Sequence, residues 1–589
     1  MPKEKHSKTT SAAGKYFGSW LSLLCFLLPV KFASLAVMPE ATSFFPEDLF
    51  SWIFVTFPAH AWGIVSGVTL LFALILFPVQ KNELKTISGR VLLLWGVIPV
   101  LAALIGWRNG AYLNYSVGMA AHFAGISAFT ASVGLYLLKH PEKKNMLITG
   151  IVTGVLYLGF SGLYQYFVGF ADMRKFIDDQ IAAGQPVNYV LWAKVQDNRV
   201  YANFTSANVL AGFLLLTLPF VLTVLYKCGD YFEPQKVSRI LFPAAGFALS
   251  GTVFFMTKSR GGFLCALLIF GVWVLTLPMR KRWRLSLVAA ALLVAVAGGI
   301  YIQKYGRGFL SASERVDYIK TSVRMVCEKP VAGYGWGGFF ERHMALKTTD
   351  SNESARDPHN IFASFASQTG IPGGVLIALV LLYPMFELGK KVFRKEADHT
   401  QVGIFWGGCA FLAHSMLDVN MQIPACLSIA GALQMIALTG KEKAETDKKE
   451  FFSCGILAAI ALISLALNIH WVVGEKALDD LMNAARPGEK AGTPAEVQRK
   501  FETLLKYRWY CHMPYETVGD YYLALKDTDS AEKLYRKSLE INQNRPAIHR
   551  RFRELYLLKG DKERAAEELK IMQKLFPSNP EYLKLNDVK

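Results

Sequence analysis

Short polar clusters interrupt otherwise apolar stretches of the sequence, and three of these clusters contain an arginine. They are the segment from Arg199 to Asn208, the tight Ser259-Arg260-Gly261-Gly262 break, and the segment around Arg315. An ionisable side chain between two apolar runs is costly to bury unless it meets an anion. A guanidinium pairs bidentately with phosphate oxygens and neutralises a departing phosphate. The arginines therefore indicate a phosphate-containing substrate, with extension of Arg260 to the membrane interface as the alternative.

A fourth cluster, Asp357-Pro358-His359-Asn360, precedes a long apolar run and contains a candidate general base. Asp favours the N-cap and Pro the first position of a helix, which predicts a helix that begins at Pro358. His359 would then lie in the first turn, where the helix dipole disfavours its protonation. A neutral imidazole in a polar cavity can accept a proton near neutral pH, and a helix start attracts phosphate. The alternative is that His359 only caps or binds a loop.

His414 and Asp418 lie one helical turn apart at the end of a later apolar run. They could orient each other or the neighbouring loop, so His414 is a candidate for substrate binding more than for catalysis. The sequence has no cluster of carboxylates that would demand a divalent metal, and we expect neither a metal site nor a cofactor. Taken together, the clusters predict attack on a phosphate-linked substrate.

The polar clusters are separated by apolar runs that could cross a membrane. Apolar residues make up 52% of the 589 residues, charged residues only 19%, and mean hydropathy is +0.27. The runs approach about 20 residues, the length that spans a hydrocarbon core. We therefore predict an all-α, polytopic membrane bundle of about 13 spans over residues 1–474. A soluble α/β protein would show shorter runs and more amphipathic periodicity.

The basic residues predict the orientation of this bundle. Net charge is +18, and much of the excess lies in alternate short connections. Examples are Lys139, Lys143 and Lys144, and Arg280, Lys281, Arg282 and Arg284. The short connections of the opposite set contain only Arg108. The positive-inside rule then places the N-terminus in the cytoplasm and, after an odd number of spans, the C-terminus outside. Orientation explains the charge more simply than nucleic-acid binding, and the long loops 170–206 and 304–360 face outward.

Residues 475–589 are polar and contain an internal repeat. Tyr522 and Tyr556, like Ala531 and Ala565, are 34 residues apart, which is the period of tetratricopeptide repeats. These repeats stack into an α-solenoid, and residues 476–511 are expected to supply a capping helix pair. We expect this outward-facing domain to bind a protein partner; the alternative is that it only stabilises the membrane domain.

In their order along the chain, the polar clusters resemble the O-antigen ligase and polymerase superfamily. The matching residues are Arg199 to Asn208, Ser259-Arg260-Gly261, Arg315, Pro330-Val331-Ala332-Gly333-Tyr334-Gly335, His359-Asn360 and Gly370-Ile371-Pro372-Gly373. The resemblance implies a metal-independent glycosyltransferase with a lipid-binding helical bundle of the GT-C type. Such enzymes move a glycan from undecaprenyl pyrophosphate to an acceptor at the periplasmic face of the bacterial inner membrane.

The resemblance also implies roles for individual residues. Arg260 and Arg315 would bind the donor pyrophosphate, and His359 would activate the acceptor hydroxyl or assist the leaving group. The further candidates for substrate contact are Arg199, Asn208, Asn360 and His414. Gln368 departs from the family pattern because many relatives carry Glu at this position, so the resemblance carries no acid–base role to it.

Several functions share this donor chemistry. Ligases load the glycan onto lipid A core, polymerases extend it, and oligosaccharyltransferases attach it to protein hydroxyls. We expect ligase-type transfer, with protein O-glycosylation and polymerisation as alternatives. An anion transporter with Arg260 and Arg315 along its path is an alternative of another class, although the spans show no internal repeat of the kind common in transporters. A non-catalytic assembly protein that acts through its repeats is a third possibility.

Overall fold

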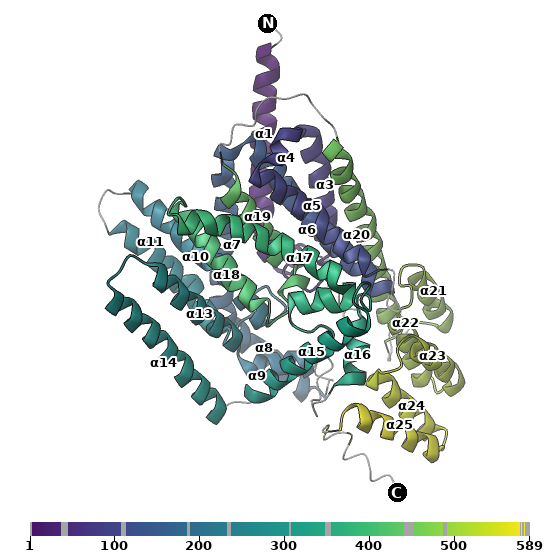
Figure 1. The fold of residues 1–589 in the computed structure, drawn as a ribbon. Coiled ribbons are helices and arrows are strands. Elements are labelled where there is room, and N and C mark those ends of the chain that lie inside the picture. Colours follow the sequence, from purple (N-terminus) through teal and green to yellow (C-terminus); the bar gives the residue numbers. More distant parts are fainter. Residues whose placement is uncertain are drawn as a thin grey trace.

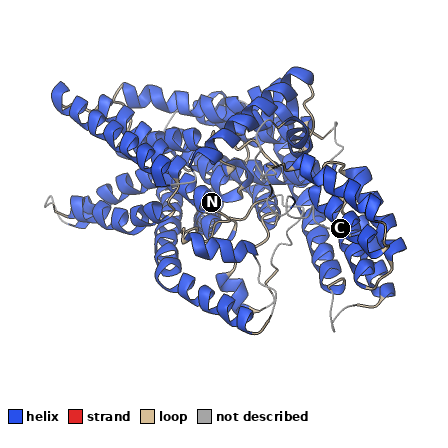
Figure 2. Cartoon of the chain, turned by 90° about the horizontal axis from the view of Figure 1, so that it is seen from below, coloured by secondary structure: helices blue, strands red, loops and turns tan. Residues whose placement is uncertain are grey.

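The chain folds entirely into helices and connections over the part that is described. The computed structural model describes residues 3–36, 45–46, 48–107, 113–184, 189–232, 237–305, 308–347, 355–440, 452–486, 492–577, 579 and 582. No strand occurs in these ranges (Figure 2), which confirms the all-α prediction. Arg108, the one basic residue expected in the short outer loops, lies outside them.

The apolar runs of the sequence coincide with helices or continuous helical stretches (Figure 1). The helices are α1 (Lys3–Lys31), α3 (Ala61–Leu76), α5 (Ile87–Ile105), α6 (Leu113–Lys139), α7 (Lys144–Tyr164), α10 (Ala207–Phe232), α11 (Ser238–Gly246) with α12 (Thr252–Met256), α13 (Arg260–Thr276), α14 (Lys281–Tyr305), α17 (Ile361–Phe393), α18 (His399–His414), α19 (Pro424–Leu438) and α20 (Phe452–Ala484). In the described ranges, 7 helices are long and apolar enough to cross a membrane, and 3 shorter ones are also apolar. The protein is therefore a polytopic membrane bundle, and the total of about 13 spans stays a prediction.

Helix α6 forms the centre of one half of the bundle, where α3, α5, α19 and α20 pack around it. Small residues permit the close approach of membrane helices. Gly125 of α6 faces Gly63 of α3 so closely that a Cβ on Gly125 would lie 2.7 Å from the Gly63 Cα. Polar side chains add bonds between helices: Asn468 Nδ2 donates to the Ala121 carbonyl at 2.8 Å. The other half is built on α10, against which α11 and α18 pack.

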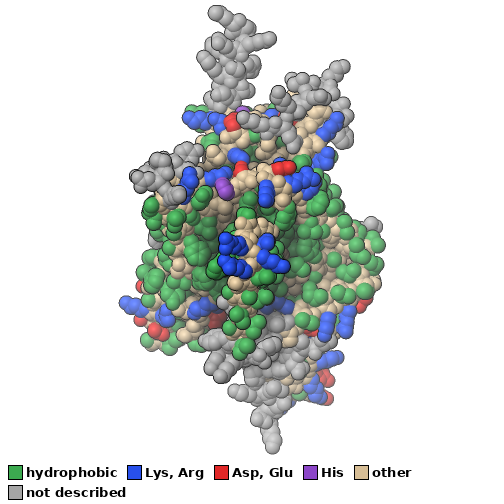
Figure 3. Space-filling model, turned by 60° about the vertical axis from the view of Figure 1, so that its left-hand side comes forward, with side chains coloured by type: hydrophobic (Ala, Val, Ile, Leu, Met, Phe, Trp, Pro, Cys, Tyr) green, Lys and Arg blue, Asp and Glu red, His purple; other side chains and the backbone are tan. Residues whose placement is uncertain are grey.

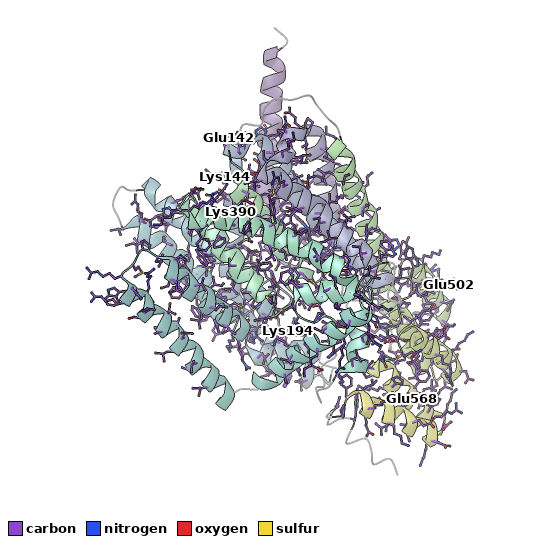
Figure 4. All side chains as sticks on the ribbon, viewed as in Figure 1. Glu142, Lys144, Lys194, Lys390, Glu502 and Glu568 are labelled. Carbon is purple, nitrogen blue, oxygen red and sulfur yellow. The ribbon has the colours of Figure 1, made fainter. Side chains whose placement is uncertain are left out.

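The bundle has two polar ends separated by an apolar belt, which Figure 3 shows on the side of α11, α13 and α14, interrupted by one compact group of Lys and Arg. Glu142, Lys144 and Lys390 lie towards the end from which α1 projects, whereas Lys194 lies towards the other end (Figure 4). Connections at the first end are joined by ion pairs. Asp398 lies 3.8 Å from Lys144 and 3.5 Å from Lys227. Several connections predicted on one side therefore do share one end of the bundle.

The two long connections contain helices of their own. Residues 170–206 form α8 (Phe170–Ala182) and α9 (Tyr189–Asp197), and residues 304–360 form α15 (Gly308–Glu328) and α16 (Gly338–Leu346). These helices lie at the end of the bundle opposite the start of α1 (Figure 1). Three apolar residues of α15 are exposed, namely Val316, Ile319 and Val323. This exposure fits a helix that lies along a membrane surface.

The C-terminal helices stack beside the bundle in both views (Figures 1 and 2). They are α21 (Pro494–Leu505), α22 (Met513–Ala524), α23 (Thr528–Ile541), α24 (Pro546–Leu558) and α25 (Lys562–Leu575). Ala531 and Ala565 are buried, as expected where the helices of a pair meet. The domain boundary expected at residue 474 falls within α20, which continues as one helix to Ala484. At this junction, the Arg508 guanidinium lies 3.9 Å from the centre of the Trp471 ring.

Candidate functional site

The polar clusters predicted from the sequence meet at the end of the bundle where α15 lies. The segment after α18 connects them: Leu417 accepts a hydrogen bond from Arg315, and Met416 accepts one from Asn360. Asp418 of the same segment acts electrostatically on Arg199, as does Arg260. Four segments that are distant in the sequence therefore form one site.

Arg199 is held by the protein itself. Its Nε donates to the Thr257 carbonyl at 2.9 Å, and its Nη2 donates to Asn208 Oδ1 at 2.5 Å. These bonds tie the segment before α10 to the end of α12, where Val200 N also donates to the Met256 carbonyl at 3.1 Å. Arg199 and Asn208 were both predicted to contact substrate, and the structure shows them bonded to each other. Their bonds position the neighbouring segments.

Arg260 is the first residue of α13, which begins within the tight break in the sequence. Ser259 caps this helix because its hydroxyl accepts a hydrogen bond from Gly262 N at 3.2 Å. Arg260 is exposed and makes no hydrogen bond or ion pair with the part of the chain that the structure describes. Its guanidinium is therefore available to an anionic ligand.

Arg315 lies on α15 and is half-buried. Its Nε donates to the Leu417 carbonyl at 3.0 Å, which joins α15 to the segment after α18. Arg315 also acts electrostatically on His414.

The prediction that a helix begins at Pro358 is wrong. The N-cap of α17 is Asn360, whose Oδ1 accepts hydrogen bonds from Phe362 N at 3.1 Å and Ala363 N at 3.0 Å. His359 precedes the helix and has a positive φ of 54°. The helix-dipole argument for a neutral His359 in the first turn therefore does not apply. Asn360, predicted to contact substrate, uses its side chain to cap this helix.

Asp357 does not cap α17 because its carboxylate is engaged elsewhere. Oδ1 accepts from His359 N at 3.0 Å, and Oδ2 accepts from the Ser364 hydroxyl at 2.6 Å. Burial raises the pKa of the Asp357 carboxyl, and the hydrogen bond from Ser364 opposes this effect. The buried carboxylate thus fixes the backbone at His359 in a turn that precedes the helix.

The His359 ring faces a second carboxylate. Its Nδ1 lies 4.0 Å from Asp418 Oδ1, and the side chains are 31% and 6% exposed, respectively. Nδ1 itself is buried and has no hydrogen-bond partner among the described residues. The exposed part of the His359 side chain therefore does not include Nδ1. A carboxylate on the Nδ1 side favours the tautomer in which Nε2 can accept a proton.

His414 bonds to the neighbouring loop, which is one of the two arrangements that the sequence left open. Asn420 Nδ2 donates to His414 Nδ1 at 3.0 Å and to the Ser415 hydroxyl at 3.2 Å. Helix α10 passes directly over this pair, since a Cβ on Gly212 would lie 2.7 Å from His414 Nδ1. His414 is only 1% exposed. It therefore lies beneath the site, where it orders the segment that contains Asp418.

The glycine-rich segment 333–338 packs against a kink in α17. Gly370 interrupts that helix with φ 76° and ψ 174°. Gln368, two residues earlier, accepts a hydrogen bond from Gly337 N at 2.8 Å and donates to the Ser364 hydroxyl at 2.9 Å. The amide uses both its donor and its acceptor, which a carboxylate could not do. Gln368 thus links the glycine-rich segment to Ser364 and Asp357.

The geometry joins a histidine–carboxylate pair to arginines that can bind an anion, a combination suited to transfer from a phosphate-linked donor. Residues 245–378 match the O-antigen ligase family, and residues 522–586 match the tetratricopeptide repeat. The chain carries an O-antigen ligase domain and tetratricopeptide repeats. It is thus a membrane protein with a glycosyltransferase-like function. No curated protein shows a significant match to it.

The matched part of the O-antigen ligase domain contains only some of the site. Arg260, Arg315 and His359 lie within it, whereas Arg199 and Asp418 lie outside. Sequence reasoning linked Asp418 to His414, one turn away, and missed its proximity to His359. It also missed Asn420, the partner of His414. Both errors concern contacts between separate segments, for which spacing along the chain gives no signal.

Proposed function

We propose that this protein moves a glycan from undecaprenyl pyrophosphate to an acceptor hydroxyl at the periplasmic face of the inner membrane, as an O-antigen ligase does. The observation that carries the proposal is that the His359–Asp418 pair lies at the segment where Leu417 bonds Arg315 and meets the start of α13 next to Arg260. The orientation rests on the positive-inside rule. The ends of the bundle support it, because the site lies opposite the end that holds the connections around Lys144 and Lys390.

The arginines bind the pyrophosphate of the donor. Arg260 is exposed and unpaired among the described residues, and Arg315 is oriented by its bond to Leu417. Both can donate to phosphate oxygens while the lipid tail remains in the membrane. Negative charge increases on the pyrophosphate as the glycosidic bond breaks, so fixed cations stabilise the transition state more than the ground state.

His359 acts on the acceptor. The acceptor oxygen attacks the anomeric carbon of the first sugar, and the bond from that carbon to the phosphate oxygen breaks. The electron pair leaves with undecaprenyl pyrophosphate, and the proton of the acceptor hydroxyl goes to His359 Nε2. Asp418 stabilises the imidazolium from the Nδ1 side. Its present distance of 4.0 Å would shorten when substrate closes the site, as is common for catalytic hydrogen bonds.

The acceptor decides between the related activities. A ligase would transfer the glycan to lipid A core, and an oligosaccharyltransferase would transfer it to protein hydroxyls. A polymerase would extend the glycan on the donor lipid. The tetratricopeptide repeats, which lie at the site's end of the bundle, fit a partner or acceptor protein there. Anion transport needs the arginines but gives no role to the His359–Asp418 pair, so the geometry favours transfer.

The test uses purified full-length protein in proteoliposomes that contain an undecaprenyl-pyrophosphate-linked glycan. Lipid A core and then a bacterial protein extract are offered as acceptors, in buffer without added divalent metal. The wild-type protein should consume the donor, and Arg315→Ala should not. Arg324→Ala is the matched control, because Arg324 is an exposed arginine on the same helix α15.

Each product has a defined meaning in this assay. Glycan on lipid A core supports the ligase reading, glycan on protein indicates an oligosaccharyltransferase, and longer chains on the donor lipid indicate a polymerase. If the folded wild-type protein leaves the donor intact with every acceptor, the transferase proposal fails, and anion flux should be measured next.

A further inference from the structure

The last repeat helix returns to the membrane domain beside the candidate site. Met572, Leu575 and Phe576 at the end of α25 form an apolar cluster with Met344 and Phe340 of α16. The Lys347 ammonium, just after α16, lies 4.2 Å from the centre of the Phe576 ring. The repeat domain is thus attached at two places, through α20 at its start and through α16 at its end.

Helix α16 brings this contact to an aromatic stack. His343 is buried next to Met344, and its ring is parallel to that of Phe339, with centroids 5.5 Å apart. The same ring meets Tyr318 of α15 edge-on at 5.0 Å. Thr321 Oγ1 lies 3.1 Å from His343 Nδ1. Two adjacent residues of α16 therefore face different neighbours: Met344 contacts the repeats, and His343 contacts α15.

Tyr318 completes the path to the candidate base. It is 3% exposed, and its ring stacks on the His359 ring with centroids 5.7 Å apart and an interplanar angle of 24°. The Asp418 carboxylate approaches the same ring, 4.0 Å from Nδ1. Because Nδ1 makes no hydrogen bond with any described residue, the stacking on Tyr318 contributes to the ring's orientation.

Helix α16 depends on its neighbours for its position. It has only 9 residues, and its N-cap is Gly337 with φ 87° and no capping side chain. Isolated helices shorter than about 12 residues are marginal in water, so most of the stability of such a helix comes from packing. Packing against the end of α25 is one of the contacts that can hold it against α15.

We propose that the tetratricopeptide repeats position His359: docking of α25 on α16 holds His343 against Tyr318, and Tyr318 holds the His359 imidazole beside Asp418. Tyr318 and His343 are then positioning residues, and a partner that pulls α25 away from α16 would loosen the base. This positioning of His359 by the repeats does not depend on which reaction the protein catalyses. Its effect on transfer rests on the proposed function of His359.

The test measures how accessible the His359 imidazole is in the full-length protein. Diethyl pyrocarbonate acylates imidazoles that are accessible, and mass spectrometry gives the labelling rate at His359. Met572→Asp places a charge in the α25–α16 cluster and should raise this rate several-fold. Ile571→Asp is the matched control because Ile571 is the adjacent apolar residue and is 39% exposed. It should label at the wild-type rate.

A second variant separates docking from folding of the repeats. Met344→Asp breaks the same cluster from the α16 side and leaves the repeat sequence intact, so it should also raise the labelling rate. Hydrogen exchange of α22–α24 should remain at the wild-type level in this variant. Wild-type labelling of His359 in both Met572→Asp and Met344→Asp would overturn the proposal.

Activity distinguishes this proposal from the proposed function. If His359 is the base, Met572→Asp should lower kcat for transfer with little change in KM for the donor, since Arg260 and Arg315 do not lie on α16. If His359→Gln keeps full activity, the proposed role of His359 fails, whereas faster labelling in the docking variants would still establish the positioning path.

Discussion

His359 and Asp418 lie beside one another at the polar end of the bundle, with Nδ1 of the histidine 4.0 Å from Oδ1 of the aspartate. The two residues come from separate connections, one before α17 and one after α18. Asp357 holds the backbone of His359, and Asn420 orders the segment of Asp418 through His414 and Ser415. The pair therefore has independent support on both sides, which suits a base that must keep one tautomer and one orientation.

Loss of either member of this pair should reduce transfer without unfolding the protein. General acid–base catalysis contributes about 10²- to 10⁴-fold, so we expect His359→Gln to lower kcat by roughly that amount. Asp418→Asn removes the charge that stabilises the imidazolium and should lower kcat by about 10²-fold. The measurement is glycan transfer in proteoliposomes at saturating donor.

Asp178→Asn is the control for Asp418→Asn, because Asp178 is an exposed carboxylate on α8. It should retain wild-type activity. Equal activity of Asp418→Asn and the wild type would remove Asp418 from the mechanism and leave only a structural explanation for its burial.

Arg260 should matter for the donor more than for the fold. It is exposed and unpaired among the described residues, so its removal leaves no broken bond inside the protein. Loss of one charge-stabilising donor costs about 10²- to 10³-fold in rate, and we expect Arg260→Ala to reduce kcat/KM for the donor by that order. Thermal unfolding in detergent should stay at the wild-type midpoint.

Arg280→Ala provides the comparison, since Arg280 is an exposed arginine just beyond the other end of α13. Its kcat/KM should not change.

Arg199→Ala should instead lower the unfolding midpoint, because it breaks bonds to Thr257 and Asn208. A stable Arg199→Ala protein with a large defect in donor KM would show that Arg199 binds substrate after all.

The sequence was sufficient for the architecture because run length and composition determine which segments can be membrane helices. The apolar runs coincide with helices, and α13 begins within the break that interrupts the apolar pattern at Ser259–Gly262. The repeats were also recognisable, because Gly519 and Ala531 occupy positions where helices approach closely. A Cβ on Gly519 would lie 2.4 Å from the Tyr535 ring.

The details of the site could not be read in the same way. Both Asp357 and Asn360 are residue types that cap helices well. Asn360 caps α17, because the Asp357 carboxylate instead accepts a hydrogen bond from the Ser364 hydroxyl. The partners of His359 and His414 likewise depend on how three connections meet. Local spacing left open whether His414 meets Asp418 or the neighbouring loop, and tertiary contacts place Asn420 at His414 and His359 at Asp418.

The kink in α17 should tolerate no side chain at Gly370. Its φ of 76° with ψ of 174° lies in a region that is essentially restricted to glycine, and a Cβ would lie 2.2 Å from the Val331 carbonyl oxygen. Gly370→Ala should therefore cost about 2 kcal/mol or more and displace the glycine-rich segment. The checks are the thermal unfolding midpoint in detergent and transfer activity, both of which should fall.

Gly271→Ala is the control for that substitution, since a Cβ on Gly271 of α13 meets no atom within 4 Å. Alanine is favoured over glycine within helices by about 1 kcal/mol, so this variant should be at least as stable as the wild type. Wild-type stability and activity of Gly370→Ala would mean that the kink relaxes easily and does not hold the glycine-rich segment.

Acid should destabilise the repeats through Glu516. This buried carboxylate of α22 lies 3.0 Å from His512 Nδ1, 2.7 Å from Arg545 Nε and 3.5 Å from Arg551 Nη1. Burial alone would raise its pKa, but the hydrogen bond with His512 and the charges of Arg545, His512 and Arg551 outweigh burial and lower the pKa to about 2. A lowered pKa in the folded state stabilises the fold above the unfolded pKa, near 4.5. This contribution, on the order of 3 kcal/mol, is lost as the pH falls from there towards 2.

Hydrogen exchange of α22–α24 in the full-length protein, corrected for the intrinsic rate at each pH, measures this effect. Wild-type protection should fall between pH 4.5 and 2, because protonation of Glu516 removes its interaction with the charges of Arg545 and Arg551. Glu516→Gln should be less protected at pH 6 and should lose less protection on acidification, while Glu567→Gln, at an exposed position of α25, should behave as the wild type does. If Glu516→Gln retains wild-type protection at pH 6 and the same acid response, the ion pairs at Glu516 do not hold the repeat helices together, and the acid sensitivity must come from other carboxylates.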